Sequence, residues 1–208
     1  MNKNLLIVGA GIYGIVAKEI AESMNCFEKI AFVDDEKETT PNGIEVIGTT
    51  ADLDELATEY SNIIVAIGNP KARLSLINRI EEELPYATAT LVSPQAYIAP
   101  SAQVYYGSII EPMAVVHTGV IISKGCIISA GAVVNHASMC CDVCHIDCNA
   151  TVAGQTVVPA GTKVESGVVF KKTGIDMADL FIKDDDTENK PHGPLPVNGM
   201  EYCFEDGM

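Results

Sequence analysis

Residues 98–170 decide the fold, and in units of six they read IAPSAQ VYYGSI IEPMAV VHTGVI ISKGCI ISAGAV VNHASM CCDVCH IDCNAT VAGQTV VPAGTK VESGVV F. Each unit opens on a large apolar residue, except at Cys140, and a small or short side chain usually follows four residues later. A period of six fits neither a helix, with a period of 3.6, nor a flat strand, with a period of two. Twelve such units predict a parallel β-helix, in which each unit forms one side of a triangular coil.

The length and charge of the chain limit what else it can be. Its 208 residues, 48% hydrophobic and 20% charged, leave room for a small second domain beside the repeats. The formal charge of −15 argues against a nucleic-acid partner, because binding a phosphate backbone needs clustered Lys and Arg.

The cysteines and the apolar segments indicate a cytoplasmic protein. Seven cysteines without a secretory framework suggest a reducing compartment, where thiols persist as small apolar fillers. Lys3 precedes an apolar run, but Gly9, Gly11 and Gly14 interrupt it, so we expect a strand and turn rather than a signal peptide. No stretch approaches the roughly 20 apolar residues that span a membrane, and we expect no membrane partner.

Residues 1–92 are predicted to form a small Rossmann-like α/β domain, because short apolar runs alternate with glycine turns and amphipathic stretches. The first predicted helix carries Ile15, Val16, Ile20 and Met24 on one side, and the last carries Leu74, Ile77, Ile80 and Leu84. The predicted strands lie at 5–8, 29–33, 63–67 and 89–92, with a further helix at 52–60.

A nucleotide site is predicted where the first strand ends. Gly9, Gly11 and Gly14 let backbone N–H groups approach a phosphate at the helix N-terminus. Asp34 and Asp35 follow about 20 residues later, where an acid commonly meets a ribose hydroxyl or a base edge. The alternative is a tight turn that only packs the helix on the sheet. Since 92 residues supply little more than one mononucleotide half, a nucleotide-sugar or ADP-ribose site is favoured over a complete NAD site.

Two histidines of the repeats are candidates for chemistry. His136 is the second residue after Val134 and faces out of the coil, so it is a candidate general base; the alternative is a plain surface histidine. His145 follows one and a half units later and lies on a different side. The two can therefore share a site only if it forms between subunits. His117, about one coil before His136, is expected to line the same cleft.

The cysteines could instead indicate a cofactor. Residues 141–145, CDVCH, match the c-type haem attachment string, and the clustered cysteines suggest a metal site. The six-residue frame argues otherwise, because it places Cys126, Cys140 and Cys144 inward. We therefore interpret them as core residues and predict no metal.

The order of these features resembles the sugar O- and N-acyltransferases of the sialic-acid O-acetyltransferase and UDP-4-amino-sugar N-acetyltransferase (NeuD/PglD-like) type. Such proteins join a small Rossmann-like domain to a left-handed β-helix of hexapeptide repeats. The resemblance covers residues 4 to about 170. The segments that carry it are 9–14, 34–35, 66–69 with Arg73, 93–94, 100–102, 135–136, 145–146 and 149–154.

The resemblance implies a homotrimeric acetyltransferase with three parts: a nucleotide-sugar-binding domain at 1–92, an acyltransferase β-helix at 93–170 and an acidic tail at 171–208. His136 would accept the proton of a sugar amine or hydroxyl as it attacks acetyl-CoA, and the Gly154 N–H would support the oxyanion. The implied contacts to the nucleotide-activated sugar come from Gly9, Gly11, Tyr13, Gly14, Asp34, Asp35, Gly68, Asn69 and Arg73. The implied contacts to acetyl-CoA, between β-helices of the trimer, come from His145, Ala153 and Gly154.

The sequence departs from that family at several points. Ala137 stands where the family has an acid that orients the histidine, with Asp142 or Glu111 as substitutes, and Ile12 and Tyr13 replace a Gly-His pair. The β-helix is about one coil short after Gly154. These departures favour, as an alternative, a weakly active or inactive nucleotide-sugar-binding scaffold; an NAD-dependent enzyme ranks third. In the tail, we expect a capping helix at 176–183, and residues 202–204 could dock on a neighbouring subunit.

Overall fold

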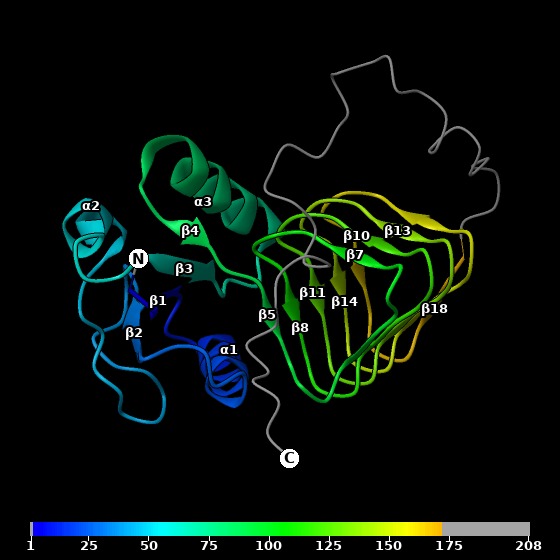
Figure 1. Ribbon diagram of the computed structural model, residues 1–208, viewed down its shortest axis with the longest axis horizontal. Helices are drawn as coiled ribbons and strands as arrows, with labels where there is room; N and C mark the ends of the chain where they lie inside the picture. The colour runs from blue at the N-terminus through cyan, green and yellow to red at the C-terminus, as the bar shows by residue number, and fades with distance from the viewer. Residues whose placement is uncertain (1, 172–208) are drawn as a thin grey trace. The chain divides into compact units, whose positions relative to one another are not determined.

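Figure 1 shows a computed structural model of the chain, in which residues 2–171 are described. These residues form two compact units, and the division falls after Pro94. The expected capping helix at 176–183 and the segment 202–204 lie outside the described residues. No helix within residues 2–171 is long and apolar enough to cross a membrane.

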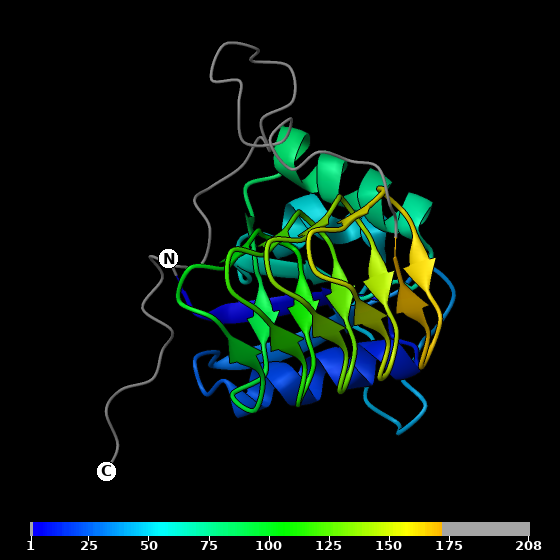
Figure 2. The same cartoon turned by 90° about the vertical axis from the view of Figure 1, so that its right-hand side faces the viewer.

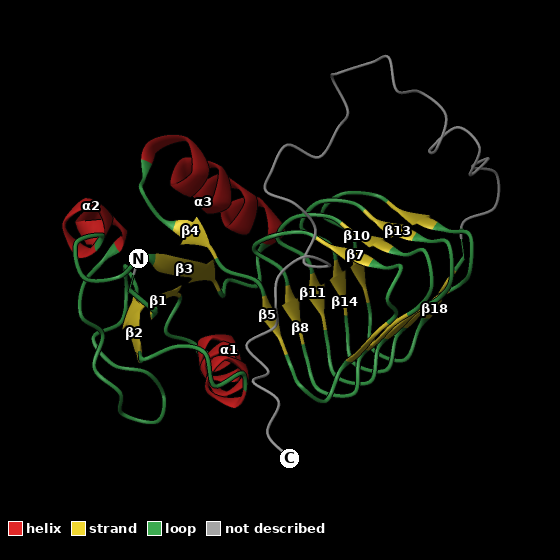
Figure 3. Cartoon of the chain, viewed as in Figure 1, coloured by secondary structure: helices red, strands yellow, loops and turns green. Residues whose placement is uncertain are grey.

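The N-terminal unit is a parallel α/β fold, as predicted. Its four strands pair in the order β2-β1-β3-β4, and every pair is parallel. The connections β1→β2 and β3→β4 run in opposite directions across the sheet. Right-handed crossovers therefore place α1 and α3 on opposite faces (Figure 3). The elements are β1 (Asn4–Val8), α1 (Ile12–Ser23), β2 (Lys29–Val33), η1 (Thr50–Asp52), α2 (Leu53–Leu56), β3 (Asn62–Val65), α3 (Pro70–Glu83), β4 (Ala87–Thr88) and β5 (Leu91–Val92).

Three local predictions in this unit were wrong in detail. The helix expected at 52–60 is a 3-10 turn followed by α2, which ends at Leu56. The fourth strand of the sheet was expected at 89–92 but is β4, at Ala87–Thr88, and only Leu91–Val92 of the expected range is strand, as β5. On α1 the buried residues are Gly14, Ala17, Ile20 and Ala21, whereas Ile15, Val16 and Met24 stay partly exposed. Small side chains face the sheet because the helix packs closely on it.

The second unit is a left-handed β-helix, as predicted (Figure 2). Its two-residue strands stack in parallel, and each pairs with the strand eighteen residues away, as Ile128 does with Ile146. Three stacks form the three sides: β7-β10-β13-β16, β8-β11-β14-β17 and β6-β9-β12-β15-β18. The strands are β6 (Tyr97–Ile98), β7 (Gln103–Val104), β8 (Ile109–Ile110), β9 (Val115–Val116), β10 (Ile121–Ile122), β11 (Ile127–Ile128), β12 (Val133–Val134), β13 (Met139–Cys140), β14 (His145–Ile146), β15 (Thr151–Val152), β16 (Val157–Val158), β17 (Lys163–Val164) and β18 (Val169–Phe170).

The core of the β-helix follows the six-residue frame. The first residues of the units, from Val104 to Val164, are at most 2% exposed. The residues four positions later, from Ala102 to Thr156, are at most 3% exposed. Only the ends open, since Val168 is 46% exposed. The predicted inward positions are therefore confirmed for every interior coil.

The corners of the coil require an unusual backbone. From Gly107 to Gly167, the third residue after each unit's first position adopts a positive φ, whether it is glycine, such as Gly131 at 69°, or not, such as Ala137 at 51°. Left-handed backbone is unfavourable for residues with a β-carbon, which explains why glycine fills most of these corners.

Candidate functional site

The glycine turn after β1 is built by close backbone packing. Gly9 has a φ of 111°, and a β-carbon there would lie 2.9 Å from the Ala66 carbonyl oxygen. A β-carbon on Gly14 would fall well inside contact distance of the Gly9 carbonyl oxygen. Close packing of the turn therefore explains the glycines at positions 9 and 14 without a ligand. Gly11 differs, because it precedes the first turn of α1 and a β-carbon there would make only an ordinary contact, 3.7 Å from the Lys37 Nζ.

Asp34 ties the glycine turn to the end of β2. Its Oδ2 accepts a hydrogen bond from the Ala10 N–H at 2.7 Å, and its Oδ1 accepts from the N–H groups of Glu36 and Lys37 at 3.0 and 3.1 Å. Partial burial raises the pKa of Asp34, but these hydrogen bonds and the Lys37 ammonium outweigh it and leave that pKa lowered. The carboxylate is thus ionised and organises the loop.

Asp35 also serves the local structure. Its carboxylate accepts hydrogen bonds from the Thr50 N–H at 2.7 Å and from the Thr50 hydroxyl at 3.0 Å. Asp35 therefore fixes the segment that leads into η1.

Lys37, which the sequence analysis did not select, lies beside the glycine turn. The Lys37 Nζ lies 3.8 Å from Asp34 Oδ2 and 3.7 Å from the position of a β-carbon on Gly11. The first backbone N–H groups of α1 carry positive partial charge at this point. The only sequence signal was a lone lysine within the acidic segment 34–38. Together these groups form an environment suited to an anion.

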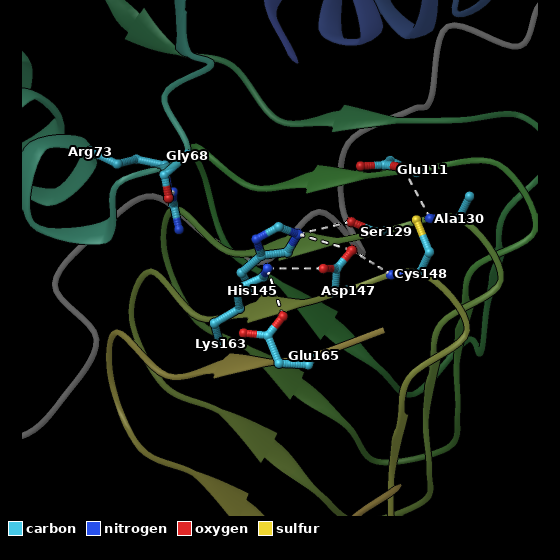
Figure 4. Close-up of polar contacts among 10 residues, drawn as sticks. All are labelled: Gly68, Arg73, Glu111, Ser129, Ala130, His145, Asp147, Cys148, Lys163 and Glu165. Carbon is cyan, nitrogen blue, oxygen red and sulfur yellow. Dashed lines mark hydrogen bonds and ion pairs between the residues drawn. The ribbon is translucent and has the colours of Figure 1, made fainter. Parts of the chain in front are cut away.

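Side-chain hydrogen bonds from two residues, Asn69 and Arg73, fix the turn after β3. Asn69 caps α3, since its Oδ1 accepts from the N–H groups of Lys71 and Ala72 at 3.0 and 3.1 Å. Arg73 is fully buried, and its Nη1 donates to the carbonyl oxygens of Ile67 at 2.6 Å and Gly68 at 3.0 Å. Figure 4 draws Arg73 beside Gly68. Asn69 and Arg73 thus shape the turn, and Gly68 stays exposed with open space around its Cα.

These turns meet at one edge of the sheet. The strand order reverses between β1 and β3, so the connections from their carboxyl ends leave to opposite sides. Ligands of open α/β sheets bind in the crevice at such a point. The structure brings the predicted segments to this edge: 9–14 with Tyr13 in the first turn of α1, 34–35, and 68–73.

In the β-helix, His136 lies exposed in the turn between β12 and β13. Asn135 Oδ1 accepts a hydrogen bond from the His136 backbone N–H at 2.8 Å and also lies 2.8 Å from the ring Nδ1. A backbone N–H can only donate, so the shared atom is the amide oxygen. The ring Nδ1 must then carry the hydrogen, which leaves the lone pair on Nε2. A neutral imidazole with this lone pair available can act as a base.

Two neighbours confine the His136 ring. Gly154 lies one coil further on, and a β-carbon there would stand 2.7 Å from the ring Cε1 and 2.9 Å from Nε2. The His117 ring lies on the preceding coil, with its centroid 6.2 Å away and its plane at 68°. His117 and Gly154 thus bound the imidazole on two sides.

His145 heads a polar cluster on another side of the coil, in the β8-β11-β14-β17 stack. Its Nε2 lies 3.0 Å from the Ser129 hydroxyl and 4.0 Å from Asp147 Oδ1 (Figure 4). Lys163 links the Asp147 and Glu165 carboxylates at 3.1 and 2.8 Å. His136 and His145 therefore belong to different sides of one β-helix, as the frame predicts.

The Asp147 carboxylate is strongly favoured in its ionised form. Burial raises its pKa, but the Cys148 N–H, the Lys163 ammonium and the nearby His145 outweigh this and hold the pKa of Asp147 at about 2. This fixed negative charge lies beside His145.

The cysteines at inward positions of the six-residue frame lie in the core of the β-helix. Cys126, Cys140 and Cys144 are fully buried, and burial raises the pKa of the Cys126 and Cys140 thiols. The Cys144 Sγ points at the Pro159 carbonyl oxygen, 3.0 Å away inside the coil, where it cannot receive a haem. Within residues 2–171, no group of three or more His, Cys, Asp or Glu side chains is placed to hold a metal ion.

Comparison with known proteins identifies the family. Residues 4–80 match the family described as the PglD N-terminal domain. The acetyltransferase domain of PglB from Neisseria gonorrhoeae, solved in complex with acetyl coenzyme A, is 30% identical, with a TM-score of 0.73. That alignment covers 82% of this chain and 92% of the PglB domain. This chain belongs to the PglD/NeuD-like acetyltransferase family.

Two solved structures of lower identity share the fold. PerB from Caulobacter crescentus, in complex with CoA and GDP-perosamine, is 18% identical with a TM-score of 0.52, over 81% of this chain and 91% of PerB. A perosamine N-acetyltransferase from the same organism, with one histidine changed to asparagine, is 20% identical with a TM-score of 0.54, over 80% and 90% of the two chains. A search of curated proteins gives no match.

The resemblance predicts an acid directly after His136, where this chain has Ala137, and neither expected substitute contacts the His136 ring among the described residues. The Glu111 carboxylate accepts from the Ala130 N–H at 3.0 Å (Figure 4), and burial raises the pKa of Asp142. Among the described residues, neither carboxylate bonds to His136. The hydrogen-bond partner of the His136 ring is Asn135. The sequence analysis placed Asn135 in a segment that carries the resemblance but predicted no role for it.

Proposed function

We propose that this chain transfers an acetyl group from acetyl-CoA to an amino or hydroxyl group of a nucleotide-linked sugar, with His136 as the general base. The observation that carries this proposal is the hydrogen-bonded His136 ring, whose Nε2 lone pair is left available on an exposed turn. The acetyl-CoA complex of the 30% identical PglB domain supports the choice of donor.

The N-terminal unit would bind the nucleotide-linked sugar. The α1 N-terminus, Gly11 and the Lys37 ammonium offer a positive environment for a diphosphate in a chain of formal charge −15. Asp34, Asn69 and Arg73 would act by holding the turns that surround it, and Tyr13 and Gly68 would contact the ligand. The GDP-perosamine bound by PerB belongs to the proposed substrate class.

The acetyl donor would bind between β-helices of a homotrimer, against His145, Ala153 and Gly154. His136 and His145 lie on different sides of one coil, so a site that uses both must form between copies. The β6-β9-β12-β15-β18 side carries Tyr97 and Val169, which are 55% and 54% exposed, and these apolar side chains suit an interface between copies.

The proposed reaction assigns one role to each of these groups. The sugar nitrogen or oxygen attacks the thioester carbonyl carbon while His136 Nε2 takes its proton. The Gly154 N–H, which bonds to no described residue, stabilises the charge on the carbonyl oxygen. The tetrahedral intermediate collapses as the bond between the carbonyl carbon and sulfur breaks. The leaving CoA thiolate takes the proton from the His136 imidazolium, which returns the base to its neutral form.

The test is a thiol-release assay with acetyl-CoA and a panel of UDP-, GDP- and dTDP-linked amino sugars. His136→Ala should lower kcat by about 10²-fold or more, since general-base catalysis contributes that much. Calorimetry with CoA and with the nucleotide sugar should show unchanged binding. Equal rates in wild type and His136→Ala would remove His136 from the mechanism.

A non-catalytic nucleotide-sugar scaffold is the second candidate, and Ala137 is the observation that favours it. It predicts that calorimetry detects nucleotide-sugar binding but no binding of CoA. Binding of both ligands without thiol release would also support it, whereas turnover with any member of the panel would exclude it.

A further inference from the structure

We infer that Asn135 is the positioning residue of this reaction, and that its amide oxygen does for His136 what a following acid does elsewhere in the family. The inference rests on the proposed function, in which His136 is the base. It concerns the tautomer and the orientation of the ring, not contact with substrate.

The position of Asn135 in the six-residue unit fixes its side chain. It directly follows the first residue of its unit, Val134, and its Oδ1 accepts the N–H of the next residue. Asp147 occupies the equivalent place after Ile146, and its Oδ1 likewise accepts the Cys148 N–H at 2.7 Å. An Asn or Asp at this corner is therefore held by the backbone of the coil before any ring contacts it.

The fixed oxygen then selects the tautomer of His136. Oδ1 is oriented by a donor that cannot accept, so the imidazole can join it only through Nδ1–H. Proton acceptance is thereby directed to Nε2. In Ser-His-Asp triads, replacing the orienting acid so that the wrong tautomer is favoured lowers kcat by about 10⁴-fold.

The surroundings restrict the ring further. Gly154 leaves room for Cε1 and Nε2 only because it lacks a β-carbon, and His117 meets the ring at 68°. Ala137, on the other side of His136 in sequence, has no polar atom in its side chain. His117 is the ionisable side chain whose ring contacts His136. Asn135 is thus the side chain that decides which nitrogen is protonated.

Nitrogen-15 NMR of histidine-labelled protein tests this directly, with His136→Ala used to assign the signal. We expect wild-type His136 at neutral pH to carry its hydrogen on Nδ1. In Asn135→Ala the two tautomers should mix, and kcat should fall about tenfold or more with KM within twofold. The His145 signal, from another side of the coil, is the internal reference and should not shift.

Asn135→Asp is the matched variant, because it keeps the oxygen and adds a charge. It should retain the Nδ1–H tautomer and recover kcat, and the acid limb of its pH–rate profile should move to higher pH. A wild-type signal with the hydrogen on Nε2, or an Asn135→Ala variant with unchanged tautomer and kcat, would overturn the inference. If the wild type binds both ligands but transfers no acetyl group, the proposed function fails while the tautomer readout still decides the role of Asn135.

Discussion

Gly154 and His136 are in contact across one turn of the β-helix. A β-carbon on Gly154 would lie 2.7 Å from Cε1 and 2.9 Å from Nε2 of the His136 ring, closer than carbon and nitrogen atoms can approach without displacement. The imidazole of His136, the proposed base, therefore packs against the backbone of Gly154 in the next coil.

Gly154→Ala should displace the imidazole. A shift of about 1 Å in a reacting group can cost about 10²-fold, so we expect kcat for acetyl transfer to fall by about that factor. Affinity for the nucleotide sugar, measured by calorimetry, should not change. Wild-type kcat in Gly154→Ala would contradict the proposed position of the base.

A double-variant cycle separates this contact from general damage to the fold. Gly154→Ala should lower Tm in the wild-type background, because the new methyl group meets the ring. The same change in the His136→Ala background should cost less, since the ring is gone. Equal losses of Tm in both backgrounds would show that the two residues are not coupled.

Lys37→Glu should weaken binding of the nucleotide-linked sugar. The change places a negative charge beside Gly11 and the α1 N-terminus, where a diphosphate is proposed to bind. We expect Kd from calorimetry to rise about tenfold, with a steeper salt dependence in the wild type. The Kd for CoA should stay the same.

Lys29→Glu is the matched control. Lys29 opens β2, whereas Lys37 follows its carboxyl end, and Lys29 pairs with Glu59 at the opposite edge of the same sheet. The variant makes the same change of charge and should leave the nucleotide-sugar Kd within twofold. A similar loss in both variants would indicate a general effect of net charge.

The sequence predicts the β-helix well because each coil repeats the same pattern of inward side chains. Every inward position must be apolar or small, so the period fixes which residues fill the inside of the coil, and Cys126, Cys140 and Cys144 follow the rule. It does not predict the burial of outward residues such as Ile109 and Ile127. The alternation of strands and helices likewise predicts the parallel sheet. The bounds of α2 and β4 were missed because short elements depend on their tertiary neighbours.

The roles within the site could not be predicted from spacing. Arg73 and Asp34 looked like ligand-binding residues, but their polar atoms bond to backbone groups of the turns. The partner of His136 was expected among acids, yet the coil corner brings the neighbouring amide to the ring instead. Such choices depend on backbone geometry that a residue pattern does not encode.

Asp147 should contribute stability that is lost in acid. Its pKa of about 2 in the folded protein lies below the usual 3.8, so the unfolded state binds its proton more readily as pH falls. The contribution, about 1 kcal/mol after solvent screening, is present above pH 4 and disappears as pH falls through 2. Asp147→Asn should lower the free energy of unfolding at pH 7 and converge with wild type near pH 2.

Glu165→Gln is the control for that titration. Glu165 also pairs with Lys163, but its side chain is 66% exposed, so its loss should change the free energy of unfolding by less than about 0.5 kcal/mol. Urea unfolding at pH 2, 3, 4 and 7 would measure both variants. An Asp147→Asn deficit that persists unchanged at pH 2 would contradict the titration.

Gly167→Ala isolates the backbone requirement of the coil corners. Gly167 has a φ of 70°, and a β-carbon there would meet nothing within 4 Å, so any cost comes from the left-handed backbone alone. That cost, about 1–2 kcal/mol, is partly offset by a less flexible unfolded chain, and we expect a net loss of about 1 kcal/mol. Gly68→Ala also has open space but no left-handed φ, and should be neutral or slightly stabilising. Urea unfolding measures both, and an equal effect of the two substitutions would refute the assignment of strain to the corners.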